Sequence, residues 1–230
     1  TAAEEAAQAL REVIAVKGGC NVIFAAAPSQ NEFLEALCRA DVDWDKVSAF
    51  HMDEYIGLPE EAPQRFGNFL RKAVFERVPF RQVEYIRGNA EDIDGEIARY
   101  TALLRDNPPD LVFMGIGENG HIAFNDPHVA HFDDTEKMRA VALDEVCRRQ
   151  QVNDGCFASL EAVPTHALTL TVPTLVSASR LFCKTKADAV GKTVLGEIRE
   201  TLPASILRMH PDAVLYIDRD SGRDVLAAWE

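Results

Sequence analysis

Residues 110–116 read Asp-Leu-Val-Phe-Met-Gly-Ile and form the most apolar strand candidate of the chain. Pro108 and Pro109 precede this run, and a glycine-rich loop from Gly117 to Gly120 follows it. A short apolar run between such breakers is typical of a strand that is buried on both faces. We therefore expect residues 110–116 to be a central strand of a parallel sheet.

Strand-like and helix-like segments alternate on both sides of this run. The other predicted strands are 21–27, 47–52, 83–86, 168–172, 181–184 and 214–218, and the predicted helices are 1–16, 29–37, 66–77, 91–105 and about 186–200. Ser29 and Glu32 fit a capping box at the start of the second helix. This alternation predicts an α/β fold: one domain over residues 1–230 with a mostly parallel sheet and helices on both faces. Residues 127–154 are the least regular, and we interpret them as a lid or an oligomer contact.

Composition limits the classes of partner. The 230 residues carry a formal charge of −13 that is spread along the chain, which argues against nucleic acid or an anionic membrane as the partner. A small anionic substrate stays compatible, because a few oriented N–H groups or one buried cation can bind it. No apolar run approaches the roughly 20 residues that span a bilayer, and the first segment is acidic, unlike a signal peptide. The five widely spaced cysteines suit reduced thiols, so a cytoplasmic protein is expected.

Polar residues follow four of the predicted strands. They are Ala27-Pro28-Ser29-Gln30, Asp53-Glu54-Tyr55, Gly115 to His121, and Lys184-Thr185-Lys186. Ligands of open α/β sheets bind beyond the carboxyl ends of the strands, so these segments are expected to meet in one active site.

The loop Gly115-Ile116-Gly117-Glu118-Asn119-Gly120 matches the Gly-x-Gly-x-x-Gly dinucleotide fingerprint. That site also requires a helix to begin at the loop, whereas Asn125-Asp126-Pro127 interrupts the chain almost at once. We favour a loop whose glycines let the backbone approach a ligand and expose His121. No nucleotide or other cofactor is expected.

Asp53 and Glu54 are adjacent at a strand end, so their side chains point to opposite sides and only one enters the cleft easily. A turn can bring Asp126 onto one ring nitrogen of His121 and leave the other nitrogen for proton transfer. A metal site would recruit His121, Asp126, His128 and His131, whose spacing matches no compact zinc motif, so no metal is expected. Ser29 suits either a helix cap or a phosphate contact.

Two segments, Phe50-His51-Met52-Asp53-Glu54-Tyr55-Ile56-Gly57-Leu58-Pro59 and residues 115–127 (GIGENGHIAFNDP), closely resemble the signature motifs of glucosamine-6-phosphate deaminases (isomerases). Weaker similarity, as in Met209-His210-Pro211-Asp212-Ala213, extends over nearly the whole chain apart from an expected N-terminal strand. The resemblance implies a Rossmann-like fold and conversion of glucosamine 6-phosphate and water to fructose 6-phosphate and ammonia.

The resemblance also implies roles for individual residues. Asp53 matches the base that moves a proton from C2 to C1, and His121 matches the group that protonates the ring oxygen. Asp126 and Asn119 match residues beside that histidine. The expected substrate-binding residues are Ala27, Ser29, Gln30, Glu54, Gly117, Gly120 and Lys186, with Lys184 as the alternative lysine.

Two segments depart from the family pattern. The phosphate loop, typically Gly-Gly/Ser-Thr-Pro, reads Ala27-Pro28-Ser29-Gln30, so one amide donor is lost at Pro28. The family's substrate-holding arginine is replaced by Asn153 or Asp154, with Arg148 or Arg149 nearby as substitutes. We expect weaker binding of a phosphate dianion, and the exact sugar stays open.

Two other functions stay open. A lactonase of the 6-phosphogluconolactonase type needs a base to activate water but abstracts no C2 proton. A non-catalytic sugar-phosphate sensor usually travels with a DNA-binding helix-turn-helix, which this sequence does not supply. Self-association into a homo-oligomer is a further hypothesis.

Overall fold

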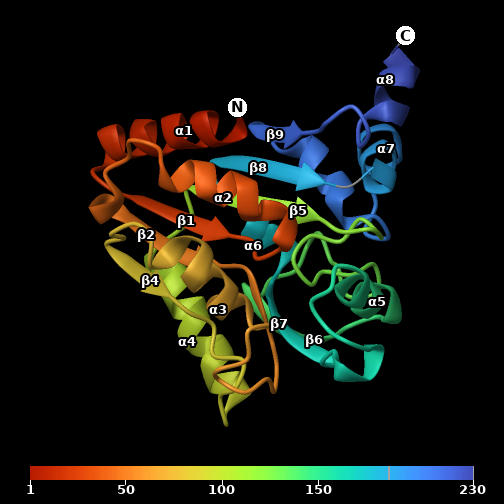
Figure 1. The fold of residues 1–230 in the computed structure, drawn as a ribbon, viewed down its shortest axis with the longest axis horizontal. Coiled ribbons are helices and arrows are strands. Elements are labelled where there is room, and N and C mark those ends of the chain that lie inside the picture. The colour runs from red at the N-terminus through yellow and green to blue at the C-terminus, as the bar shows by residue number, and fades with distance from the viewer. Residues whose placement is uncertain (186, 230) are drawn as a thin grey trace.

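A six-stranded parallel sheet forms the centre of the molecule (Figure 1). The computed structural model describes residues 1–185 and 187–229. Across the sheet the strands are β4 (Gln82–Glu84), β2 (Val47–His51), β1 (Cys20–Phe24), β5 (Leu111–Ile116), β8 (Arg180–Thr185) and β9 (Ala213–Tyr216). Every neighbouring pair is parallel. The prediction of an α/β fold is confirmed, with β5 near the middle of the sheet as expected.

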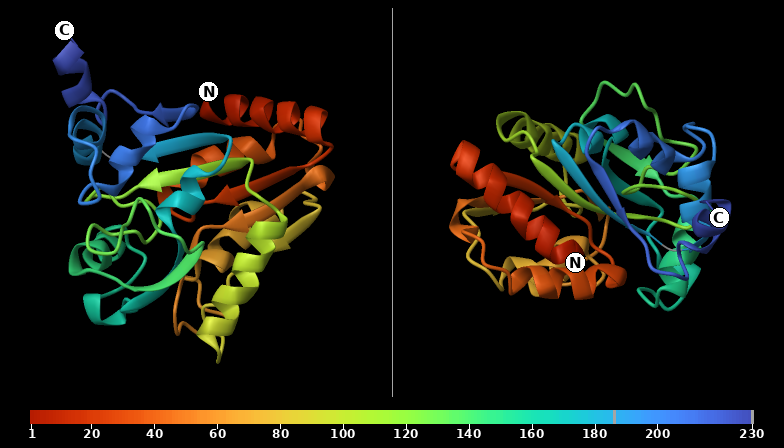
Figure 2. Two further views of the ribbon diagram at one scale, coloured as in Figure 1. Left: turned by 180° about the vertical axis from the view of Figure 1, so that it is seen from behind. Right: turned by 90° about the horizontal axis from the view of Figure 1, so that it is seen from above.

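Helices cover both faces because side chains alternate along each strand. Val22 and Phe24 of β1 pack with α1 (Ala2–Lys17), α2 (Asn31–Cys38) and α3 (Phe66–Leu70). Ile23, between them, belongs to the core formed with α4 (Ile93–Asp106), α6 (Val172–Val176) and α7 (Ala187–Leu195). In Figure 1 α2 lies in front of the sheet, whereas α6 comes to the front in the view from behind (Figure 2).

A second, antiparallel sheet lies below the first in Figure 1, in the order β3 (Asp53–Tyr55), β7 (His166–Leu170) and β6 (Met138–Ala142). The sequence placed residues 168–172 in the parallel sheet, and this assignment is wrong. The expectation that residues 127–154 are the least regular holds for residues 127–137, which form no helix or strand, and is wrong for the rest, where β6 and α5 (Glu145–Asn153) lie. The burial along β6 does not alternate regularly, which explains its weak signal.

Two helix predictions need correction. Residues 66–77 divide into α3 and the π-helical η3 (Arg71–Phe75). Before α2 the chain makes the 3-10 turn η1 (Pro28–Gln30), so Ser29 does not cap α2; a capping box occurs instead at Thr1 and Glu4. The remaining elements are η2 (Trp44–Lys46), η4 (Leu160–Ala162), η5 (Pro203–Met209) and α8 (Arg223–Trp229).

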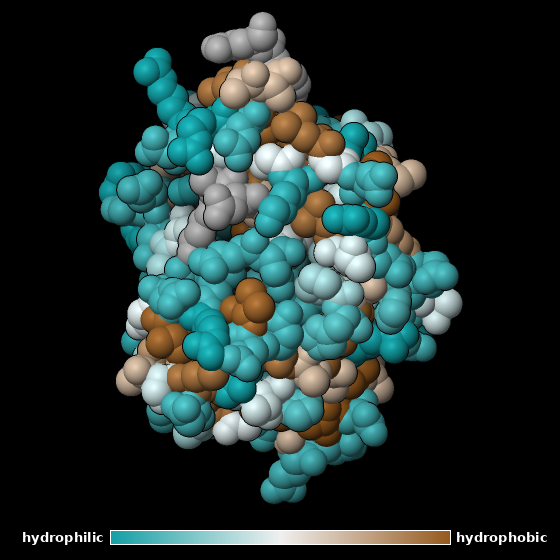
Figure 3. All heavy atoms as spheres, turned by 90° about the vertical axis from the view of Figure 1, so that its right-hand side faces the viewer, coloured by the Kyte–Doolittle hydropathy of each residue, from teal (hydrophilic) through white to brown (hydrophobic). Residues whose placement is uncertain are grey.

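The surface is mixed in character. On the face drawn in Figure 3, apolar side chains lie in separate small groups among hydrophilic ones. Within the described part of the chain, no helix has the length and apolarity that crossing a bilayer requires.

Candidate active site

A pocket of about 360 Å³ opens where the strands of the parallel sheet end. Its walls come from the ends of β5 and β8 and the segments after β1, β2, β5 and β9, together with residues of α3 and α5. The residues that line it are Ala25, Ala26, Ala27, Ser29, Met52, Asp53, Phe66, Gly115, Ile116, Gly117, His121, Ala123, Phe124, Gln150, Gln151, Asp154, Lys184, Asp218, Asp220 and Ser221. The predicted convergence of the four polar segments is confirmed. Lys186 lies outside the described residues.

Asp53 sits at the junction of the two sheets. The preceding Met52 is hydrogen-bonded to both sheets. Its N–H donates to the Phe24 carbonyl oxygen of the parallel sheet (3.3 Å), and its carbonyl oxygen accepts from the Leu170 N–H of the antiparallel sheet (2.8 Å). Asp53 then pairs with Thr169 as the first residue of β3. Burial, followed by the nearby charge of Glu54, raises the pKa of Asp53 well above its ordinary value. The site thus holds a carboxylate of increased basicity.

Glu54 is not among the residues that line the pocket, so the geometry gives no support to its expected substrate contact. Its buried carboxylate accepts the N–H groups of Tyr55 (2.9 Å), Phe66 (3.0 Å) and Gly67 (3.0 Å). The Arg65 Nε atom lies 3.6 Å from one of its oxygens. The carboxylate therefore fixes the start of α3 against β3.

We expect Glu54→Gln to lower the free energy of unfolding by about 2–4 kcal/mol, because the amide NH₂ would face the Gly67 N–H and Arg65. Urea denaturation of the variant and of Glu60→Gln, a change at an exposed glutamate, measures the difference. Equal stabilities for the two variants would contradict this role.

Two side chains, those of Asn119 and Asp126, contact His121 at its Nδ1 atom. Its Nδ1 atom lies 2.7 Å from Asn119 Oδ1 and 3.3 Å from Asp126 Oδ1, and Asn119 Nδ2 donates to that carboxylate at 3.0 Å. Burial would raise the pKa of Asp126, but hydrogen bonds from His121 and Asn119 outweigh it and lower the pKa. A stable carboxylate therefore orients the imidazole and leaves Nε2 for proton transfer, as the sequence predicted.

Gly117 gives the imidazole its space. A Cβ atom on Gly117 would lie 2.1 Å from His121 Cε1 and 2.3 Å from Nε2. Gly120, in contrast, has a φ of +82° and forms a turn in which its N–H donates a hydrogen bond to the Gly117 carbonyl oxygen (3.0 Å). It is not among the residues that line the pocket. The pocket lining therefore gives no support to the expected substrate contact of Gly120.

Ala27 and Ser29 line the pocket as predicted, but Gln30 does not. Gln30 is buried, and its Nε2 atom donates to the Met114 carbonyl oxygen at 3.4 Å. It faces a neighbouring cavity that Phe33 and Phe113 also line. The expected substrate contact of Gln30 therefore has no support from the pocket lining, because the side chain that follows the 3-10 turn faces this other cavity.

A group of charged residues lines another part of the pocket. Lys184 Nζ donates to the Ser29 carbonyl oxygen at 3.1 Å. Three carboxylates, those of Asp154, Asp218 and Asp220, line the same pocket as this ammonium group. From the sequence we expected Asn153 or Asp154 at the position of the family's arginine but missed Asp218 and Asp220. Asp218 is the last residue of the predicted strand 214–218, so the rule applied to the other strand ends would have found it.

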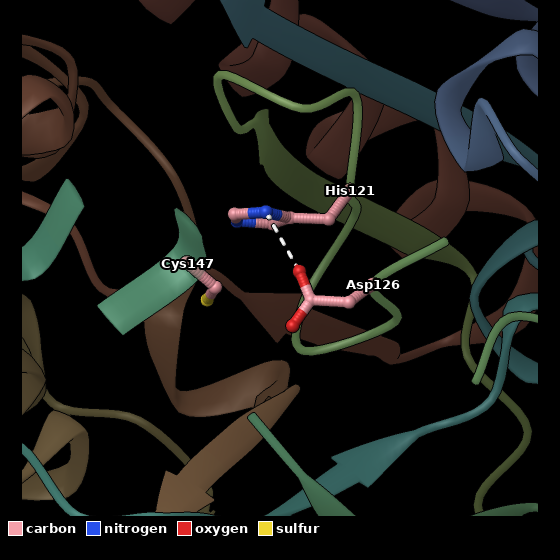
Figure 4. Close-up of side chains that lie close together, drawn as sticks. All are labelled: His121, Asp126 and Cys147. Atoms are coloured by element: carbon pink, nitrogen blue, oxygen red, sulfur yellow. Dashed lines mark ion pairs between the residues drawn. The ribbon is translucent and has the colours of Figure 1, made fainter. Parts of the chain in front are cut away.

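One cluster beneath the pocket combines three kinds of metal ligand (Figure 4). His121, Asp126 and Cys147 each offer one ligand atom, and these atoms lie within 4.8 Å of one another. His128 groups instead with Asp126 and Asp144, and His131 Nδ1 lies 3.9 Å from Glu200 Oε2. The four-residue metal set considered from the sequence is therefore not assembled.

The fold and the site together define an α/β enzyme whose pocket pairs a basic carboxylate with an oriented histidine. The model of the family "Glucosamine-6-phosphate isomerases/6-phosphogluconolactonase" matches residues 1–216. The chain belongs to this family, which confirms the resemblance found in the sequence.

Curated relatives and solved structures agree with this membership. The chain is 34% identical to a glucosamine-6-phosphate deaminase of Streptococcus sanguinis, covering 94% of this chain and 91% of the relative. It is 33% identical to that of Streptococcus pneumoniae serotype 4, covering 92% and 90%. A solved monomeric glucosamine-6-phosphate deaminase superposes with a TM-score of 0.86 at 28% identity, over 97% of this chain and 93% of that one. The 6-phosphogluconolactonase of Thermotoga maritima (TM-score 0.74, 17% identity, 93% and 91% covered) shares the fold.

Proposed function

We propose that the protein converts glucosamine 6-phosphate and water to fructose 6-phosphate and ammonia, a hydrolytic deamination coupled to isomerisation in amino-sugar (N-acetylglucosamine) catabolism. One observation carries the proposal: Asp53 and His121 line the same pocket, one as a buried base and the other as an oriented imidazole. The deaminase names of the relatives at 33–34% identity support it.

The proposed reaction uses the two groups in sequence. His121 protonates the ring oxygen and opens the sugar ring, while Asn119 and Asp126 hold Nδ1 and so direct Nε2 toward the pocket. Asp53 takes the C2 proton and returns it to C1. The C=O double bond at C1 is thereby replaced by a C=N double bond at C2. Water adds at C2 as ammonia leaves, and the 2-keto sugar results.

The charged residues that line the pocket affect how strongly it binds the phosphate group of the substrate. Lys184 and Ser29 offer a cation and a hydroxyl, whereas Asp154, one of the two residues expected to replace the family's substrate-holding arginine, adds a carboxylate to the lining. Like charge in a partly desolvated cleft weakens binding of a dianion, so we propose a high KM for phosphorylated sugars.

Ammonia release tests the proposal, with glucosamine 6-phosphate, galactosamine 6-phosphate and unphosphorylated glucosamine as parallel substrates. Release from a phosphorylated sugar that disappears in Asp53→Asn supports it. No ammonia from any of the three sugars would overturn it. A lactonase would instead hydrolyse 6-phosphogluconolactone and would form neither ammonia nor fructose 6-phosphate, whereas the proposed reaction forms both.

We expect Asp154→Arg to raise kcat/KM for glucosamine 6-phosphate at least ~10-fold, because a repulsive charge becomes an attractive one. Asp133→Arg changes the net charge equally at an exposed residue that does not line the pocket, and is the matched control. An equal gain in the control, or a gain on unphosphorylated glucosamine, would contradict a local effect on phosphate.

A further inference from the structure

The cluster of His121, Asp126 and Cys147 contains one nitrogen, one oxygen and one sulfur ligand. The first two side chains come from the loop after β5, and Cys147 comes from the first turn of α5, whose N-cap Asp144 accepts the Cys147 N–H at 2.6 Å. In Figure 4 the imidazole lies above the Asp126 carboxylate and the Cys147 thiol lies to its left, so the three groups surround one space. All three residues are buried, and the proposed reaction gives Cys147 no role.

The separations suit a tetrahedral ion. Zinc binds histidine nitrogen and carboxylate oxygen at about 2.0–2.2 Å, so two such ligands lie ~3.4 Å apart around one ion. The Nδ1 atom of His121 and the Oδ1 atom of Asp126 are already 3.3 Å apart. Sulfur binds zinc at a slightly longer distance, about 2.3 Å. The Cys147 sulfur is the third ligand atom, and all three ligand atoms lie within 4.8 Å of one another.

We propose that His121, Asp126 and Cys147 form a binding site for a thiophilic divalent cation such as Zn²⁺, and that the bound cation inhibits the enzyme. The ion enters through the pocket, because His121 lines it. A Zn–S bond forms as the thiol proton passes to solvent, and the fourth coordination position is left for water.

Inhibition follows from the histidine tautomer. In the metal-free protein Nδ1 faces Asn119 Oδ1 and Asp126, which leaves Nε2 free to accept a proton. A cation on Nδ1 requires the neutral ring to carry its proton on Nε2. That ring cannot take up a second proton while the metal is bound, so the acid–base cycle of His121 stops. The metal site stands independently of the proposed function, whereas inhibition of ammonia release depends on it.

Cobalt(II) absorption tests binding without any enzymatic assay. The intact protein with Co²⁺ is expected to show a thiolate-to-cobalt charge-transfer band that Zn²⁺ abolishes. Cys147→Ser removes the band, whereas Cys156→Ser, which changes a half-buried thiol just beyond the same helix, keeps it. In parallel, zinc inhibition of ammonia release, measured against each variant's own metal-free rate, weakens at least ~10-fold in Cys147→Ser alone, since even outer-shell changes cost this much affinity.

Three results would overturn the metal site. They are the absence of the band in both the intact protein and Cys156→Ser, loss of the band in Cys156→Ser, and an undiminished band in Cys147→Ser. The first two need no change at the cluster, so they stay decisive even if Cys147→Ser fails to fold. A cobalt band without zinc inhibition would retain the site and refute its effect on His121.

Discussion

Asp53→Asn is expected to lower ammonia release from glucosamine 6-phosphate by roughly 10²- to 10⁴-fold, the usual contribution of a general base. The amide keeps the shape of the side chain in its place between the two sheets but cannot accept the C2 proton. Activity close to that of the unmodified protein would exclude Asp53 as the base.

The same substitution is expected to stabilise the protein at neutral pH. Burial, and then the charge of Glu54, raises the pKa of Asp53 in the folded protein above its ordinary value of 3.8. The folded state therefore binds this proton more tightly than the unfolded state, and stability is lost as pH rises from the ordinary value through the raised one. Asn removes that loss, so the urea midpoint of the variant exceeds that of the parent at neutral pH.

The pH dependence separates this effect from a general change in packing. The gain in stability should disappear below the ordinary pKa of aspartate, where both states of the parent are protonated. Asp133→Asn, at an exposed carboxylate, should show no such trend. In the parent enzyme, kcat/KM should fall as pH drops through the raised pKa of Asp53. An acid limb at the ordinary aspartate value would show that burial does not tune the base.

Gly117→Ala is expected to reduce kcat by about 10²-fold, because displacement of a reacting group by about 1 Å costs this much. The new Cβ would lie 2.1–2.5 Å from three atoms of the His121 ring, so the imidazole must leave its position beside Asp126. Imidazole resonances measured by NMR should report the displacement directly.

Gly115→Ala is the matched control for this displacement. A Cβ at Gly115 meets only ordinary contacts, at 3.6 Å from Gln30 Nε2 and 3.7 Å from the Lys184 carbonyl oxygen. The His121 resonances should therefore stay in place in this variant. If Gly117→Ala also leaves them unchanged, the glycine does not control the imidazole.

The parallel sheet could be predicted almost completely from sequence, because most of its strands contain a short apolar run with clear breakers; β4 (Gln-Val-Glu) is the exception. The antiparallel sheet could not. Its first strand, β3, has only three residues, Asp-Glu-Tyr, and two of them are charged. Its formation depends on partners that are distant in sequence, and intrinsic propensity contains no information about them.

The candidate site was predictable in its reacting groups and less so in its substrate contacts. Asp53 and His121 were found because strand ends and a glycine loop place them together. Glu54, Gln30 and Gly120 have suitable chemistry but serve the protein's own backbone: three N–H groups, a carbonyl oxygen and a turn. These residues interact with neighbouring backbone groups, and only the tertiary fold determines which backbone groups lie next to them.

The hydrogen bonds on both sides of Met52 also affect the order of events during synthesis. The Leu170 N–H and the pairing of Asp53 with Thr169 come from a part of the chain that the ribosome makes long after Asp53 has emerged. Closing such a large loop is slow, as for all contacts between distant residues. We therefore expect nascent chains that end before residue 166 to form the N-terminal strands and helices without a positioned base. The enzyme would thus have no catalytic activity until most of its chain has been translated.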